Sequence, residues 1–401
     1  MNFLIYLINE GLSKLLPYIT VLIIAKYIDV ESFGQLTLYY IILEILTIII
    51  ANNIRATARI DFFQSSKERY VETKSAHLTG SFLIFTTVLI IGTFTDFLEF
   101  KYLFLLSVTG FMRAFTHFIL SDLQCRENAK VYGIYNIIPL FLSSGLFLIA
   151  ILSGYSIYSW FYTIFIGAFI QFIFVLRYII TNKLLNIENM FNFKDIYSEL
   201  KHGIIFMPQA IGFWVNSAVD RVLISNILGN LIVGYYMFAF QLLTPVIIFS
   251  TVVNLYLTPK LNKLLKENKI YKIKKILLSF SILTLVFTIV NFIAIEIVIN
   301  YFYYDKYASS LEYAPFVVVA LFFQALYLIY MNIFYYIGQK KFISLLVLFL
   351  AFLKIIGVYI CLNIFYIYGL LYVNILINIL IFIFIFIKMN TSLKNYTGEI
   401  K

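Results

Sequence analysis

Apolar runs of about twenty residues follow one another along almost the whole sequence. A helix needs about 20 mostly apolar residues to cross the hydrocarbon core of a bilayer. Cutting the chain at charged or turn-rich stretches predicts spans at residues 4–28, 33–55, 76–95, 102–124, 131–153, 156–181, 203–226, 231–257, 276–302, 312–337, 342–362 and 365–387. The composition agrees, because 62% of the residues are hydrophobic and 12% are charged, against about 45–50% and about 25% in soluble domains. We therefore predict an all-α integral membrane protein with about twelve transmembrane helices.

Basic residues gather in alternate loops. The second, fourth, sixth, eighth and tenth connections and the C-terminal tail carry most of the Lys and Arg, whereas the odd connections carry only Lys101 and Lys306. Short loops rich in Lys and Arg remain in the cytoplasm. Both termini are therefore predicted to be cytoplasmic, which also requires an even number of spans. The last two spans meet near Asn363 without a charged loop between them. They are counted as two spans because the combined apolar run is longer than one span needs.

The two halves of the sequence contain a similar hairpin. Phe33-Gly34-Gln35-Leu36 and Val233-Gly234-Tyr235-Tyr236 lie two hundred residues apart, and each follows an apolar helix with an early proline. Because an even number of spans separates the two hairpins, both halves would have the same orientation in the membrane, which predicts a parallel repeat. The alternative is chance similarity between two apolar hairpins. The predicted domains are an N-terminal six-helix bundle (1–181), a cytoplasmic linker (182–201), a C-terminal six-helix bundle (202–388) and a cytoplasmic tail (389–401).

Motifs of soluble enzymes are not found in the sequence. It contains no phosphate-binding glycine loop and no HExxH pair. Two distant cysteines and three scattered histidines predict neither a disulfide framework nor a metal site. No cofactor is expected, and the net charge of +10 follows from the cytoplasmic loops rather than from nucleic-acid binding.

Several charged residues lie inside the predicted spans, where ionisable groups are costly and are usually functional. Counting about 1.5 Å per residue from the ends of each span gives the depth of each charged residue. Some of them lie near the midplane of the bilayer, and others lie toward its outer face. The central charges are mainly basic, and a basic cavity in a membrane suits an anionic substrate. The midplane group is Lys14, Glu44, Arg113 and Lys354, and the outer group is Lys26, Asp220, Arg221 and Glu296.

These charges define the candidate site residues. The predicted anion-binding residues are Arg113, Lys354, Lys14 and Arg221; the predicted ion-coupling or gating residues are Asp220, Glu44 and Glu10; Arg55 and Arg59 are predicted to lie at the cytoplasmic mouth. Asp220 shares one helix face with Gln209 and Asn216, which indicates an inward-facing polar stripe. The alternative is internal pairing of Lys14 with Glu10 and of Arg113 with Glu44, or, for Asp220 and Arg221, a helix anchor.

The order of small motifs around the seventh and eighth spans resembles a known family. The matching residues are Gly203, Pro208, Asp220, Arg221, Gly229, Gly234 and Tyr235, with first-half counterparts at 26–34 and 52–55. This pattern resembles the polysaccharide-export branch of the multidrug/oligosaccharidyl-lipid/polysaccharide (MOP) flippase superfamily. Within that branch the chain most resembles O-antigen flippases of the Wzx type.

The resemblance implies two six-helix bundles around a central cavity and transport by alternating access. It implies a non-enzymatic flippase of lipopolysaccharide biosynthesis in the bacterial inner membrane. The implied substrate is an undecaprenyl-diphosphate-linked oligosaccharide, which moves from the cytoplasmic to the outer leaflet. Implied partners are membrane lipid, a coupling H⁺ or Na⁺, a polysaccharide polymerase and a chain-length regulator.

Three other functions remain open. A cation-coupled multidrug antiporter of the same superfamily would favour an acidic cavity, whereas the central charges here are mainly basic. A membrane-embedded polymerase or glycosyltransferase would usually have a large outer loop, and the longest odd connection here is only the segment near 303–311. A non-transporting scaffold is the third alternative.

Overall fold

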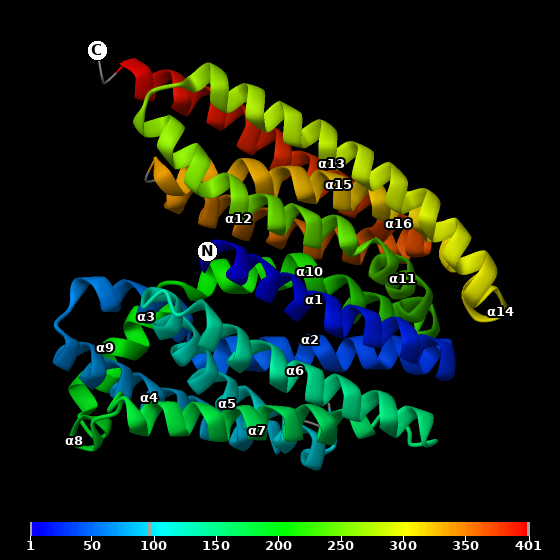
Figure 1. The fold of residues 1–401 in the computed structure, drawn as a ribbon. Helices are drawn as coiled ribbons and strands as arrows, with labels where there is room; N and C mark the ends of the chain where they lie inside the picture. The colour runs from blue at the N-terminus through cyan, green and yellow to red at the C-terminus, as the bar shows by residue number, and fades with distance from the viewer. Residues whose placement is uncertain (1, 95–97, 338, 399–401) are drawn as a thin grey trace. The chain divides into compact units, whose positions relative to one another are not determined.

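Helices make up every regular element in the part of the chain that the structure describes. This computed structural model describes residues 2–94, 98–337 and 339–398 (Figure 1). The elements are α1 (Asn2–Tyr27), α2 (Val30–Ala51), α3 (Ile54–Gln64), α4 (Lys67–Gly92), α5 (Phe100–Cys125), α6 (Ala129–Leu152), α7 (Ser159–Thr181), α8 (Ile187–Met190), α9 (Phe193–Ile204), α10 (Met207–Leu228), α11 (Asn230–Leu243), α12 (Pro245–Lys266), α13 (Ile270–Val298), the π-helix η1 (Ile299–Tyr303), α14 (Tyr304–Tyr307), α15 (Ser310–Tyr336) and α16 (Lys340–Gly398). The predicted all-α membrane fold is confirmed.

The number of spans agrees with the sequence prediction. Eight helical segments in the described part are long and apolar enough to cross a membrane, and the bent pair α11–α12 makes a ninth. The pair bends by 41° beside Pro245, which cannot donate a backbone hydrogen bond to the preceding turn. Helices α1 and α10, which are not counted among these, contain 26 and 22 residues, which is also enough for a span. With α16 counted as two arms, the described helices accommodate twelve spans.

The two arms of α16 form an antiparallel helical hairpin. Tyr366 interrupts the helix with φ 53° and ψ −145°. A Cβ on Gly357 would lie 3.3 Å from Val373, and a Cβ on Gly369 would overlap the backbone oxygen of Cys361. Both glycines therefore allow the arms to approach closely. The predicted join near Asn363 is confirmed, with the break three residues further along the chain.

Two predicted loops are helical instead. The predicted span 33–55 stops at Ala51, because Asn52 and Asn53 adopt positive φ angles of 43° and 55°. The basic connection that follows forms α3 and the first turns of α4, not an open loop. The predicted linker 182–201 contains α8 and most of α9.

The chain forms two compact units. Unit 1 comprises Met1–Ile28 and Tyr39–Trp214, and unit 2 comprises Asp29–Leu38 and Val215–Lys401. In unit 1, α6 packs on α1 and α7, and α5 packs on α3, α4 and α7. In unit 2, α15 packs on α11, α12, α13 and α16. The division by sequence repeat into residues 1–181 and 202–388 remains a prediction.

The start of α2 packs inside unit 2 through the repeated glycines. A Cβ on Gly34 would overlap the backbone oxygen of Asn230 and lie 2.9 Å from the backbone nitrogen of Gly234. A Cβ on Gly234 would overlap the backbone oxygen of Val30. The two contacts are reciprocal, because Val30 and Asn230 each precede their glycine by one helical turn. Such reciprocity is expected when equivalent helices of a repeat cross each other.

Aromatic side chains strengthen the same contact. Phe33 packs edge-on against Phe238 and Tyr307, with ring centroids 5.9 Å apart in each pair. Phe238 and Tyr307 stack with centroids 3.8 Å apart. Each aromatic pair contributes about 0.5–1.5 kcal/mol beyond its buried area. The glycine crossing is therefore set in a well-packed part of unit 2.

Candidate functional site

A buried ion pair lies at the centre of the candidate site in unit 2. Nζ of Lys354, on the first arm of α16, lies 2.9 Å from Oδ1 of Asp220 on α10. The residues are 2% and 4% exposed, respectively. Removing two charges from solvent costs several kcal/mol per ion, which is offset only when the pair has further polar partners. The neighbours of this pair supply them.

Three neutral groups complete the partners of the two charges. The hydroxyl of Tyr236 and the amide of Asn374 donate to Oδ2 of Asp220 over 3.0 and 2.8 Å. The ammonium of Lys354 donates to the backbone oxygen of Asn216 over 2.5 Å. Four helical segments thus converge on one carboxylate and one ammonium: α10, α11 and the two arms of α16.

Several buried oxygens around this pair have no hydrogen-bond donor among the described residues. They are Oδ1 of Asn216, Asn374 and Asn378, and all three residues line a pocket with Asp220 and Lys354. These three oxygens can still accept hydrogen bonds in the pocket beside the ion pair.

Part of this cluster was predicted from sequence. Asn216 and Asp220 do share one face of α10, as the stripe predicted, but the side chain of Gln209 lies outside the described residues. Sequence analysis missed Tyr236, Asn374 and Asn378. The last two are four residues apart on one helix, a spacing that can be found in the sequence once uncharged amides are considered.

A second pocket lies in unit 1 around Arg113 on α5. Besides Arg113, its polar or aromatic lining side chains are Thr20, Tyr40, Ser143, Ser144, Phe147, Trp160 and Thr163. Arg113 is half-buried. No hydrogen bond or ion pair to its guanidinium is found among the described residues. A partly buried guanidinium that forms no ion pair with a described residue and is surrounded by hydroxyl groups is suited to an anion with several oxygens.

Glu44 was the predicted alternative partner of Arg113. The carboxylate is close enough to interact electrostatically with Arg113, but no ion pair within 4.0 Å joins the two in the described structure. The side chain of Glu44 is instead exposed. The structure thus brings the two residues near each other without a direct ion pair between them.

The remaining predicted residues occupy separate places. Lys14 is half-buried on α1, and the side chain of Glu10 lies outside the described residues. The guanidinium of Arg221 lies over the Phe240 ring, 5.9 Å from its centroid. Arg55 and Arg59 are exposed on α3, and Arg59 donates to Gln124. Their roles remain predictions.

A second buried network was missed entirely by sequence analysis. Lys74 on α4 is fully buried, and its Nζ lies 2.6 Å from Asp61 and 2.7 Å from Glu199. Nδ1 of His77 lies 3.3 Å from the same Glu199 carboxylate. Burial would raise the pKa of Glu199, but the hydrogen bond to His77 and the charge of Lys74 lower this pKa to about 2.

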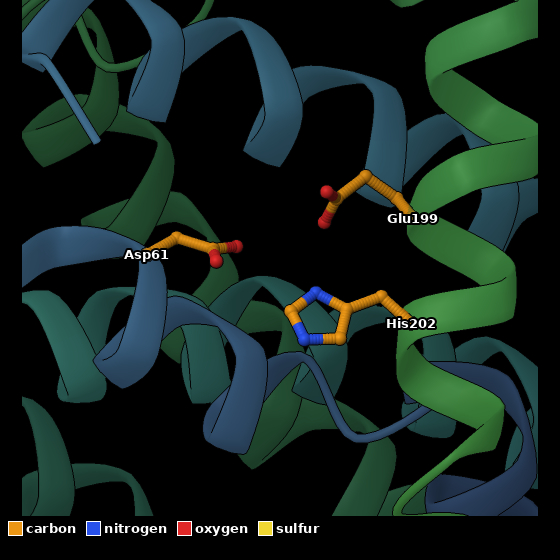
Figure 2. Close-up of side chains that lie close together, drawn as sticks. All are labelled: Asp61, Glu199 and His202. Atoms are coloured by element: carbon orange, nitrogen blue, oxygen red, sulfur yellow. The ribbon is translucent and has the colours of Figure 1, made fainter. Parts of the chain in front are cut away.

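Three side chains of this region point toward one another in a way that resembles a metal site. Figure 2 shows Asp61, Glu199 and His202, whose ligand atoms lie within 4.8 Å of one another. The ammonium of Lys74 contacts both carboxylates and already supplies a positive charge between them. The arrangement is therefore a buried ion-pair network that joins α3, α4 and α9.

Comparisons with known proteins identify the family. Residues 1–254 match the family described as polysaccharide biosynthesis protein. The chain is 22% identical over 364 residues to protein 1 of the Lsg locus of Haemophilus influenzae strain Rd, which covers 85% of each protein. The match to the family extends over more than half of this chain.

Solved structures show the same fold. The lipid II flippase MurJ in an inward closed conformation superposes with a TM-score of 0.78 at 17% identity, over 98% of this chain and 90% of that one. An outward-facing multidrug resistance MATE family transporter of the MOP superfamily gives a TM-score of 0.66 at 13% identity, over 99% and 96%. The chain is thus a multi-pass membrane protein that belongs to the polysaccharide biosynthesis protein family.

Proposed function

We propose that this protein moves an undecaprenyl-diphosphate-linked oligosaccharide, such as an O-antigen repeat unit, from the cytoplasmic to the outer leaflet. The proposal places it in the bacterial inner membrane with both termini in the cytoplasm. Transport by alternating access, coupled to an ion, is part of the proposal. Family membership supports the class of substrate, and the arrangement of charges supports the anionic head group.

The observation that carries the proposal is the guanidinium of Arg113. It lines a pocket in unit 1 together with hydroxyl groups of Ser144 and Thr163, and no described carboxylate forms an ion pair with it. A diphosphate provides several oxygens for the planar fork of an arginine. The hydroxyl groups offer additional hydrogen bonds to phosphate or sugar oxygens.

Lys354 links substrate binding to ion coupling in this proposal. Its ammonium is held by Asp220 in the structure, so it is not available to a second anion. A proton that binds Asp220 would neutralise the carboxylate and release Lys354 to contact an anionic group. Because the carboxylate of Asp220 and an anionic substrate compete for one lysine, proton binding at Asp220 favours substrate binding, and the coupling is reciprocal.

The antiporter alternative is less well supported. A cationic drug requires a carboxylate that it can reach, whereas Asp220 is 4% exposed and its charge is balanced by Lys354. Arg113 would also repel a cation from the pocket in unit 1.

The proposal can be tested in a bacterial strain that lacks its own flippase but makes the lipid-linked repeat unit. The protein is expected to restore surface polysaccharide, and Arg113→Ala is expected to abolish most of this export at unchanged protein level. Arg177→Ala is the matched control, because Arg177 is an exposed arginine on α7 outside the pocket. Failure of the native protein to expose any lipid-linked oligosaccharide on the outer face would refute the proposed function.

A further inference from the structure

The connection between α7 and α10 contains a helix with two distinct faces. On α9, one face is buried and comprises Asp195, Ile196, Glu199 and Gly203. The opposite face presents Phe193 and Tyr197, which are 80% and 70% exposed. Such a division is typical of an amphipathic helix, although here the exposed face is the aromatic one.

The buried face holds α9 rigidly on unit 1. Arg69 on α4 donates two hydrogen bonds to Asp195, over 2.6 and 3.1 Å. Lys74 contacts Glu199 over 2.7 Å, and the amide of Asn52 donates to the backbone oxygen of Leu200 over 3.0 Å. The helix therefore cannot rotate to bury its aromatic residues without breaking these contacts.

The exposed face combines apolar and basic side chains. Phe193, Tyr197 and Ile204 follow helical spacing, and all three are exposed. Lys194 and Lys201 are exposed beside them. Aromatic rings next to lysines are typical of helices that lie in the interface between lipid head groups and acyl chains.

The neighbouring span shows what covers this face. α7 ends at Thr181, and Ile180 in its last turn is 73% exposed, as expected for a side chain that faces lipid. Ile187, at the start of α8 between α7 and α9 in the sequence, is also 73% exposed. We propose that the exposed face of α9 lies in the cytoplasmic leaflet and binds anionic lipid head groups through Lys194 and Lys201. This goes beyond the proposed transport function, and only the assignment to the cytoplasmic leaflet rests on the orientation proposed there.

Depth in the bilayer can be measured with a spin label. Tyr197→Cys, in a protein in which Cys125 and Cys361 are replaced by serine, would carry a nitroxide in nanodiscs of phosphatidylglycerol and phosphatidylethanolamine. The label is expected to be more accessible to oxygen than to a water-soluble nickel chelate. Lys266→Cys, an exposed position at the end of α12, is the control and should show the opposite preference.

Two results would overturn the depth assignment. Equal access of the nickel chelate to positions 197 and 266 would place α9 in water. Protection of position 197 from both reagents would indicate that a second copy or another protein covers it.

Binding of anionic lipid by Lys194 and Lys201 can be measured separately. Native mass spectrometry of the purified protein should show preferential retention of phosphatidylglycerol over phosphatidylcholine. The double change Lys194→Gln with Lys201→Gln is expected to reduce this preference, roughly fivefold for each lysine. Lys272→Gln, an exposed lysine at the start of α13, is a control for the loss of one positive charge elsewhere. An unchanged lipid preference in the double variant would refute the role of the lysines.

Discussion

Nζ of Lys354 lies 2.9 Å from Oδ1 of Asp220 inside unit 2, so a residue predicted to bind substrate pairs with a residue predicted to couple an ion. Tyr236 and Asn374 donate to the carboxylate, and the ammonium donates to the backbone oxygen of Asn216, so each charge has further polar neighbours. A change in the protonation of Asp220 would therefore change which partner Lys354 contacts.

Removing one member of this pair should cost more than removing both. Lys354→Met leaves a buried carboxylate without a cation and is expected to destabilise the protein by about 3–5 kcal/mol. The double change Lys354→Met with Asp220→Asn should recover most of the thermal stability of the purified protein while export stays absent. A Lys354→Met protein with an unchanged melting temperature would contradict the structural importance of the pair.

Arg113 should be replaceable only in part by lysine. Loss of a charge-assisted contact with phosphate costs about 1.5–3 kcal/mol, or roughly ten- to hundredfold in affinity. Arg113→Lys should retain some export, because the charge remains but the planar fork is lost. If Arg113 only neutralises Glu44, the combined change of both residues to alanine should restore export. Full export by that double variant, at normal protein level, would exclude substrate binding by Arg113.

The crossing at Gly34 and Gly234 should not tolerate even a methyl group. A Cβ on either glycine meets backbone atoms, which cannot move away as a flexible side chain can. Gly34→Ala and Gly234→Ala are therefore expected to lower the melting temperature and export together. Gly145→Ala is the control, since no atom lies within 4 Å of its added Cβ and alanine favours a helix by about 1 kcal/mol. Equal behaviour of the three variants would disprove the close crossing.

Acid should destabilise unit 1 through Glu199. Its pKa is lowered from 4.5 to about 2 in the folded protein, so its contribution is fully present above about pH 5 and is lost as the pH falls toward 2. A shift of this size corresponds to about 3 kcal/mol. Glu199→Gln should reduce the melting temperature at pH 7 and flatten its dependence on pH between 5 and 2. Glu68→Gln, at an exposed position on α4, should leave this dependence unchanged.

Reporter insertions that show which side of the membrane a residue occupies can test the hairpin in α16. A reporter inserted at Tyr366, which is 69% exposed, is expected to be active on the outer side of the membrane. Reporters after Lys401 and at Asn268, between α12 and α13, should give a cytoplasmic signal, because the basic residues of the chain gather on that side of the membrane. A cytoplasmic signal at residue 366 would contradict both the hairpin and the predicted orientation.

The sequence by itself determined where the chain can cross a membrane. Span length, loop charge and helix-breaking residues are local properties, so the runs before and after Asn363 could be separated without any structure. The repeated glycines at 34 and 234 were recognised in the same way, but their direct contact was not. The family resemblance also depended on local motifs, and the match over residues 1–254 agrees with it.

Only the tertiary structure decided which polar groups meet. Lys354 was expected to be available to substrate, yet it pairs with Asp220, and Lys74 with Glu199 was not expected at all. Partner choice depends on how each helix is rotated. In a membrane, an apolar side chain gains little by turning from lipid to protein, so apolar periodicity does not fix that rotation. Close backbone contacts and buried polar pairs between distant segments fix it, and these exist only in the folded chain.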